Sequence, residues 1–296
     1  TTDAFFLSVD GGVDMHMHGP VFFDAILKLI KEGKLTEERV NKACAKILEA
    51  KFRLGLFENR YVTEAGIKKT VFTKKHQQTA LEIARRSIVL LKNESLLPVD
   101  TRKFKKILVT GPNANNQSIM GDWVFEQPEK NVSTILEGIK EEASGTQINY
   151  VDVGWNMRAL DSAKIEEAIQ TAKSSDLAIV IVGEDSFRQH WKEKTCGENR
   201  DRMDITLWGK QDYLVESIYK TGVPTIVILI NGRPLATRWI AENIPAVIEA
   251  WEPGSMGGKA IAEILFGKVN PSGKLPITIP RHVGQISTVY NHKPSQ

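Results

Sequence analysis

Residues 176–184 read DLAIVIVGE, and residues 224–232 read PTIVILING. Each is an unbroken apolar run that ends in a small or polar residue, without the alternation of a half-exposed strand. Such runs are typical of strands that are buried on both faces, as in a parallel sheet with helices on both sides. These two stretches therefore predict an α/β fold.

The segments around these two runs repeat the same alternation. Residues 76–93 are expected to form a helix that runs into a strand. Further apolar strands are expected within 105–112, 147–154 and 246–254, and amphipathic helices within 133–144, 161–175, 207–222 and 257–267. Because helices of about a dozen residues separate the strands, the pattern predicts parallel strands joined by right-handed crossovers. The sequence from residue 76 onward is therefore expected to form a doubly wound α/β sandwich.

The first part of the chain has a different organisation. Residues 4–19 are a strand-and-turn candidate, and residues 22–34 and 35–57 have helical spacing, the second helix ending near Gly55. One strand and two helices cannot close a core, and the chain does not begin with Met or with a signal-peptide pattern. We therefore expect a piece of a longer protein, with 58–75 as a charged linker.

Composition and charge exclude several classes of protein. With 296 residues, 42% hydrophobic and 25% charged, the chain can bury a large core, and its net charge of +3 is small. Neither a nucleic-acid groove nor a membrane surface is indicated. The two cysteines, Cys44 and Cys196, are far apart, so neither a disulfide framework nor a cysteine-based metal site is expected.

The longest connection of the predicted sandwich follows the strand at 177–184. It reads DSFRQHWKEKTCGENRDRMDIT (185–206), whereas most such connections have about 2–6 residues. Long loops at the carboxyl ends of parallel strands commonly bind ligands. Glu198 lies in the charged string GENRDR within this loop. From the pattern alone, Glu198 is either a proton donor or part of a solvated turn.

Seven stretches together resemble family 3 of the glycoside hydrolases, in the order expected for that family. They are GGVDMHMHG, RVNKACAKILEAKFRLGLFENRY, ARRSIVLLKNESLLPV, ILVTGPNAN, GENRDR, NGRPL and PGSMGGKAIAEILFGKVNPSGKLPITIPR. The resemblance implies that residues 1–57 are the C-terminal end of a (β/α)8 barrel, its last strand-helix portion. It implies a linker at 58–75 and an (α/β)6 sandwich domain at 76–296. The family's nucleophilic aspartate, in a Ser-Asp-Trp-like setting, and its barrel Lys-His pair have no match here.

The resemblance implies that Glu198 is the catalytic acid/base, since its loop matches the family's Glu-x-x-Asp-Arg pattern. Glycoside hydrolysis needs one carboxyl group to attack and one to protonate the leaving oxygen. That acid must keep its proton near neutral pH, and burial under a sugar would favour this. We expect the neighbouring arginines to pair with Asp201 and nearby acids. Glu193 is the second candidate for the acid/base and Glu184 the third.

Three further residues are expected to bind substrate. Trp123, in MGDWVFEQ, and Trp191 could stack on a sugar ring, although a buried tryptophan of the core remains the alternative for both. The resemblance places His16 at the rim of the sugar pocket. His16 and His18 lack a third ligand, so no metal site is expected, and no glycine-rich dinucleotide motif occurs. His190 could be a proton shuttle or a surface side chain.

The predicted function is that of a retaining, exo-acting β-glycosidase that hydrolyses terminal non-reducing β-D-glucosyl residues by double displacement. A β-xylosidase or exo-glucanase of the same family, and a non-catalytic carbohydrate-binding fragment, remain alternatives. No cofactor is expected, because the chemistry uses carboxyl groups. The expected partners are a β-glucoside or oligosaccharide and the barrel portion of the same protein, while a homodimer stays open. The resemblance favours a secreted or periplasmic protein.

Overall fold

The computed structural model describes residues 2–285 and divides the chain into two compact units, Thr1–Thr73 and Lys74–Gln296. Each unit is described by itself. Within residues 2–285, every helix is too short or too polar to cross a lipid bilayer.

All regular secondary structure in the described part of the first unit is helical. It contains α1 (Thr2–Asp10), α2 (Phe22–Lys31), α3 (Glu37–Arg53) and α4 (Glu64–Thr70). The strand expected within 4–19 is wrong, because α1 occupies its first half. A strand there would need a neighbouring strand for its backbone hydrogen bonds, and the described part of this unit contains none, whereas a helix satisfies them internally. In the helix, Phe5, Phe6 and Val9 reach the small core of the unit.

The two other N-terminal segments largely follow the sequence. Helix α3 begins at the cap residue Thr36, whose hydroxyl accepts a hydrogen bond from the Arg39 N–H, and Gly55 follows its end with φ 66°. The expected linker is not wholly irregular, because α4 forms within it. Thr63 caps that helix by accepting from the Gly66 N–H at 3.1 Å.

The second unit is a six-stranded sheet in the order β1-β6-β5-β4-β2-β3. The strands are β1 (Val89–Asn93), β2 (Lys106–Thr110), β3 (Gln147–Val151), β4 (Leu177–Gly183), β5 (Thr225–Ile230) and β6 (Ala246–Glu249). All neighbouring pairs are parallel except β1 with β6, which is antiparallel. The prediction of parallel strands is therefore wrong for β1. This edge strand follows α5 (Lys74–Ser87) directly, so no crossover from another strand fixes its direction.

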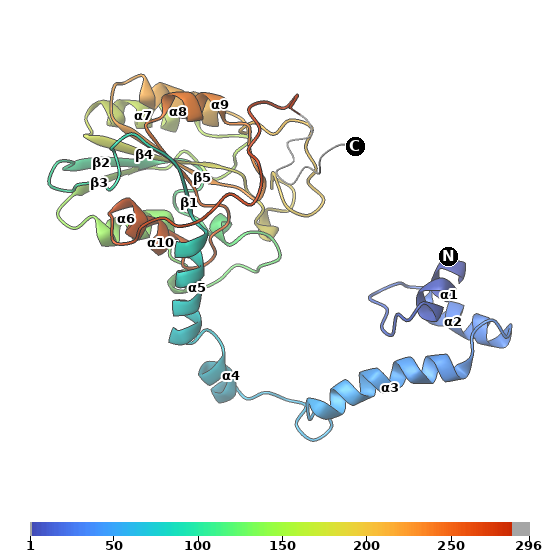
Figure 1. Ribbon diagram of the computed structural model, residues 1–296. Helices are drawn as coiled ribbons and strands as arrows, with labels where there is room; N and C mark the ends of the chain where they lie inside the picture. Colours follow the sequence, from blue (N-terminus) through green and yellow to red (C-terminus); the bar gives the residue numbers. More distant parts are fainter. Residues whose placement is uncertain (1, 286–296) are drawn as a thin grey trace, which may run out of the picture. The chain divides into compact units, whose positions relative to one another are not determined.

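Helices cover both faces of the sheet, as expected of a doubly wound fold (Figure 1). Helices α7 (Ser162–Lys173), α8 (Gln211–Tyr219) and α9 (Arg238–Asn243) lie on one face, and α6 (Ile135–Glu142) and α10 (Gly257–Leu265) on the other. The short α9 is not predicted by the sequence pattern. Alternate residues of β4 enter separate cores, Ile179 and Ile181 on one side and Val180 and Val182 on the other. This explains why the strand is apolar throughout.

The order of the strands creates a point where two loops diverge. From β2 the chain passes to β3 on one side, and from β3 it returns to β4 on the other side of β2. Ligands of open α/β sheets bind at such a switch point, outside the carboxyl ends of the strands. The loops that follow β2 and β4 both leave the sheet here, beginning at Gly111 and after Gly183.

Candidate functional site

Glu198 lies in the long loop after β4, between two residues with positive φ. Gly197 has φ 85° and Asn199 has φ 58°, so the backbone turns sharply around the glutamate. The side chain of Glu198 is 41% exposed, and its Oε2 accepts from Arg188 Nη1 at 3.0 Å. Its backbone N–H donates to Asp122 Oδ2 at 2.8 Å. The carboxyl group is therefore open to solvent while its backbone is anchored.

Asp122, in the loop after β2, is the anchor. Besides the Glu198 N–H, its carboxylate accepts from Lys194 Nζ at 2.8 Å, Arg188 Nη1 at 3.2 Å and the Trp123 N–H at 2.8 Å. Burial alone would raise the pKa of Asp122, but the bonds from Lys194 and from the backbone of Glu198 and Trp123 outweigh it and lower the pKa to about 2. Asp122 is therefore an anion that ties the two loops together.

Two features allow this anchor to form. A Cβ on Gly197 would lie 2.6 Å from Asp122 Oδ2, so only glycine lets the loop approach the carboxylate so closely. The Lys194 side chain is fully buried, and it is balanced by Asp122 and by the Trp191 ring, whose centroid is 4.4 Å from Nζ. A buried ammonium is stable only when it is paired in this way.

Arg188 lies close to the rings of both Trp123 and Trp191. The guanidinium carbon of Arg188 is 3.7 Å from the centroid of the Trp123 ring and 5.1 Å from that of Trp191. The two tryptophans are 69% and 39% exposed, so the buried-core alternative is wrong for both. Arg188 thus brings Glu198 and both tryptophans into one group. Their contact with substrate stays a prediction.

The arginines of GENRDR pair only partly as expected. Arg200 donates to the backbone carbonyl groups of Lys194, at 3.2 Å, and of Trp191. Arg202 donates to Glu184 Oε1 at 2.8 Å and to the Thr206 carbonyl group. Arg202 thus pairs with a nearby acid, as expected, whereas pairing of either arginine with Asp201 is not observed. Both arginines thus tie parts of the loop together, and Arg202 also supplies a donor to the buried Glu184 carboxylate.

Glu184, the third candidate for the acid/base, lies beneath the loop. Its side chain has no exposed surface and forms ion pairs with Arg202 at 2.8 Å and Arg233 at 3.1 Å. An enclosed carboxylate cannot contact a sugar, so this candidate is wrong. Arg233 thus ties the loop after β5 to this acid. Glu193 is half-buried, and its carbonyl group accepts from Arg158 Nε at 3.1 Å.

His190 is more than a surface side chain. Its Nδ1 lies 2.6 Å from Oδ2 of the buried Asp185, and its ring stacks on Trp155 with 3.9 Å between the centroids. Both rings line a polar hollow beside β3 that also contains Asn115 and Asp152. The carboxylate thus orients the imidazole toward a hollow at the ends of β2 and β3.

His16 belongs to the first unit. Its ring stacks on Phe22 with 4.3 Å between the centroids, and it meets Phe5 edge to face at 5.2 Å. The ring is thus held by packing within its own unit, and its role in substrate binding stays a prediction. Within residues 2–285, no three side chains among His, Cys, Asp and Glu come together as a metal site would require.

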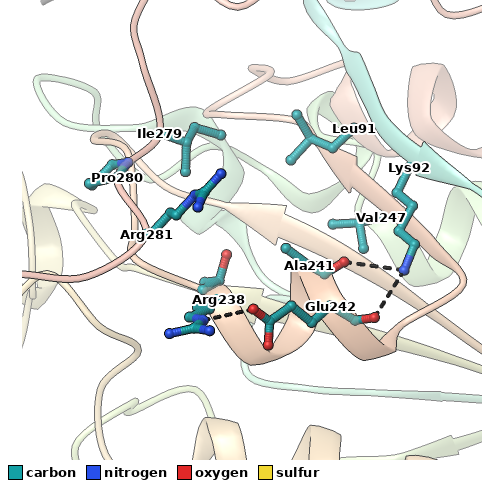
Figure 2. A pocket seen from close by; sticks show the side chains of 10 residues that line it. Leu91, Lys92, Arg238, Ala241, Glu242, Val247, Ile279, Pro280 and Arg281 are labelled. Carbon is teal, nitrogen blue, oxygen red and sulfur yellow. Dashed lines mark hydrogen bonds and ion pairs between the residues drawn. The ribbon is translucent and has the colours of Figure 1, made fainter. Parts of the chain in front are cut away.

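A second hollow lies against β1 and α9 and is distinct from the loops described above (Figure 2). Lys92 donates to the carbonyl groups of Ala241 and Glu242 at 3.2 and 3.3 Å, and the Glu242 carboxylate accepts from Arg238 at 2.7 Å. The Glu242 carboxylate of this hollow is thus paired with Arg238, and Lys92 is held by backbone carbonyl groups.

Sequence reasoning named Glu198 and the tryptophans as candidates but did not name Asp122, Lys194 or Arg188. The only local signal for Asp122 is its place beside Trp123. Lys194 lies 72 residues from Asp122, and no periodicity links positions so far apart.

Comparison with known proteins agrees with this architecture. The profile of the Glycosyl hydrolase family 3 C-terminal domain matches residues 88–296. A beta-xylosidase of Formosa agariphila is 37% identical over 99% of this chain and 41% of its own length. A periplasmic beta-glucosidase of Salmonella typhimurium is 34% identical over 98% of the chain and 40% of its own length. The chain thus spans about two fifths of the length of these relatives.

Solved structures give the same result. A beta-glucosidase involved in saponin metabolism from intestinal bacteria has a TM-score of 0.86 and 31% identity, covering 100% of this chain and 45% of that structure. The beta-glucosidase of Listeria innocua, in complex with isofagomine, has a TM-score of 0.85 and 30% identity, covering 98% of this chain and 39% of that structure. The chain therefore belongs to glycosyl hydrolase family 3, and residues 88–296 are its C-terminal domain.

Proposed function

We propose that this chain is the C-terminal part of a retaining, exo-acting β-glycosidase in which Glu198 is the acid/base. The observation that carries the proposal is the anchored, solvent-open carboxyl group of Glu198, placed beside two exposed tryptophans at the switch point of the sheet. The relatives, which are named as glucosidases and xylosidases, support the same chemistry.

In the proposed reaction Glu198 acts twice. It first donates its proton to the glycosidic oxygen while a carboxylate from the rest of the protein attacks the anomeric carbon. It then takes a proton from the water that releases the sugar. Arg188, 3.0 Å from Oε2, stabilises the carboxylate that remains after the first step. Trp123 and Trp191 offer apolar ring faces on which a sugar can stack.

The remaining assignments of the proposal follow the family. Residues 1–57 are taken as the end of a barrel, 58–75 as a linker and 76–296 as the sandwich domain. A terminal β-D-glucosyl group is the first candidate for the substrate, with a β-xylosyl group as the alternative because both names occur among the relatives. A secreted or periplasmic location is supported by the relative that is named as periplasmic.

The test uses the full-length protein that contains this chain, with Glu198→Ala. The substrates are 2,4-dinitrophenyl β-glucoside and β-xyloside, assayed with and without azide. Their leaving group needs no proton, so the glycosyl-enzyme should still form. Its hydrolysis should slow by about 10²–10⁴-fold, because the base that activates water is missing. Azide needs no such base, so it should restore turnover and give a glycosyl azide as the product. Glu193→Ala, in the same loop, is the matched control and should keep most of the activity.

A barely changed rate for Glu198→Ala would reject Glu198 as the acid/base. Rescue by azide in Glu193→Ala would transfer the role to that residue. If the unaltered protein binds oligosaccharides but hydrolyses neither glycoside, the carbohydrate-binding alternative is supported instead.

A further inference from the structure

Glu252, in the loop after β6, occupies the junction of the loops that follow β2, β4 and β5. Ser186 Oγ, from the loop after β4, donates to its Oε1, and Cys196 Sγ lies 4.0 Å from the same oxygen. Neither the sequence patterns nor the acid/base mechanism uses this carboxyl group.

Two glycines leave room for the Glu252 carboxyl group. A Cβ on Gly121 would lie 2.7 Å from Oε2, and a Cβ on Gly232 would lie 3.2 Å from Oε1. Gly121 also has φ 83°, a conformation that favours glycine. The carboxyl group therefore sits in a slot between the loops after β2 and β5, which any larger side chain at Gly121 would fill.

The contacts of Glu252 are the chain neighbours of the residues that anchor Glu198. Gly121 directly precedes Asp122, the acceptor of the Glu198 N–H, and Cys196 lies two residues before Glu198. Ser186 Cβ lies 3.2 Å from the place where a Cβ of Gly197 would be. A shift of the Glu252 carboxyl group would therefore reach both ends of the Asp122–Glu198 hydrogen bond.

We propose that Glu252 is a positioning residue, which fixes the loops after β2 and β4 against each other and so sets the place of the Glu198 carboxyl group. The proposal rests on the proposed function of Glu198. Burial raises the pKa of Glu252. The hydrogen bond from Ser186 lowers the pKa in part, whereas the nearby charges of Glu184, Asp122 and Asp185 raise it further. Glutamine has the same length as glutamate and keeps an oxygen that can accept from Ser186 Oγ, so it serves as the conservative variant.

The test measures kcat/KM of the full-length protein for aryl β-glycosides whose leaving groups differ in acidity. A misplaced general acid slows poor leaving groups, which need a proton, but spares good ones. For Glu252→Ala, kcat/KM on the phenyl glycoside should fall at least about tenfold. This is only a fraction of the rate factor of about 10²–10⁴ that general acid catalysis supplies. On the 2,4-dinitrophenyl glycoside, kcat/KM should change little. Glu252→Gln should restore most of the loss.

Ser186→Ala is the second variant, because it removes the bond to Glu252 without emptying the slot. Its kcat/KM should show the same dependence on the leaving group, with a smaller decrease than in Glu252→Ala. The midpoint of its thermal unfolding should be nearly unchanged. Ser174→Ala, at the exposed end of α7, is the matched control and should leave the whole series unchanged.

Glu198→Gln is the reference for interpreting the series. If it shows the dependence on the leaving group and Glu252→Ala loses the same factor on every substrate, Glu252 has only a structural role and the inference is overturned. If Glu198→Gln shows no such dependence, the proposed function fails and the inference falls with it.

Discussion

At the scale of single residues, Glu249 is a carboxyl group enclosed in β6. Its side chain accepts from the Trp251 N–H at 2.9 Å and from Asn231 Nδ2 at 3.1 Å, and the residue is 1% exposed. Burial raises the pKa of Glu249 from its ordinary value of 4.5 to about 7, against the effect of these two bonds. The folded protein therefore holds this proton where the unfolded chain releases it.

This shift predicts how stability depends on pH. The contribution of Glu249 is fully present below about pH 4.5 and is lost as the pH rises toward 7, a change of about 3 kcal/mol. Glu249→Gln cannot ionise, so its free energy of unfolding should fall less between pH 5 and 7.5. Urea unfolding at several pH values measures this, with the exposed Glu166→Gln as the control. Parallel curves for the protein and Glu249→Gln would contradict the prediction.

The buried ion pair beneath the loop is a second case at this scale. Arg202→Met would leave the enclosed Glu184 with Arg233 alone, at a cost of about 3 kcal/mol, because a buried carboxylate that loses one of its two partners is poorly compensated. Arg238→Met breaks an exposed pair with Glu242 and should cost no more than about 1 kcal/mol. Denaturant unfolding compares the two variants. Equal losses would show that burial does not decide the cost.

At the scale of elements, α6 and α10 pack through glycines. A Cβ on Gly138 would lie 2.3 Å from the Gly258 carbonyl oxygen, and one on Gly258 would lie 2.0 Å from that of Thr134. The backbones of the two helices thus touch directly below the sheet. Helix α6 begins at a capping box, in which Thr134 and Glu137 bond each other's backbone N–H groups.

This contact predicts that Gly258→Ala pushes the helices apart. Overpacking in a core of this kind costs about 1–3 kcal/mol, so the midpoint of thermal unfolding should fall by several degrees. Lys140→Ala, on the exposed side of α6, should change stability by less than about 0.5 kcal/mol. If the midpoint of Gly258→Ala is unchanged, the helices separate more easily than this packing implies.

At the scale of the whole molecule, the two units differ in what they bury. The sheet unit has a core on each face, whereas the described residues of the first unit bury only a small cluster around Val9, Ile26, Leu29 and Leu35. Several apolar side chains of α3 and the residues after it remain exposed, among them Phe52 and Leu54. So small a core cannot offset the entropy of ordering the chain.

Residues 74–296, produced alone, should therefore unfold in one cooperative transition, while residues 1–73 alone should not. Calorimetry and circular dichroism of the two pieces would show this. A broad, non-cooperative transition for residues 74–296 would mean that the sheet unit depends on the rest of the protein.

The sequence by itself determined the alternation of strands and helices in the sheet unit, and it indicated the loop that carries Glu198. These features follow from short-range patterns: apolar runs buried on both faces, helical periodicity and loop length. The antiparallel direction of β1 and the helix α1 were not determined in this way, since each depends on which strand, if any, lies beside the segment.

Only the tertiary structure decided how Glu198 is held. Asp122, Lys194 and Arg188 come together because the ends of β2 and β4 are neighbours in the sheet. Glu252 joins them from the loop after β6, 66 residues from Ser186. Such pairs are set by the order of strands, because charged groups far apart in sequence meet only after distant strands have paired.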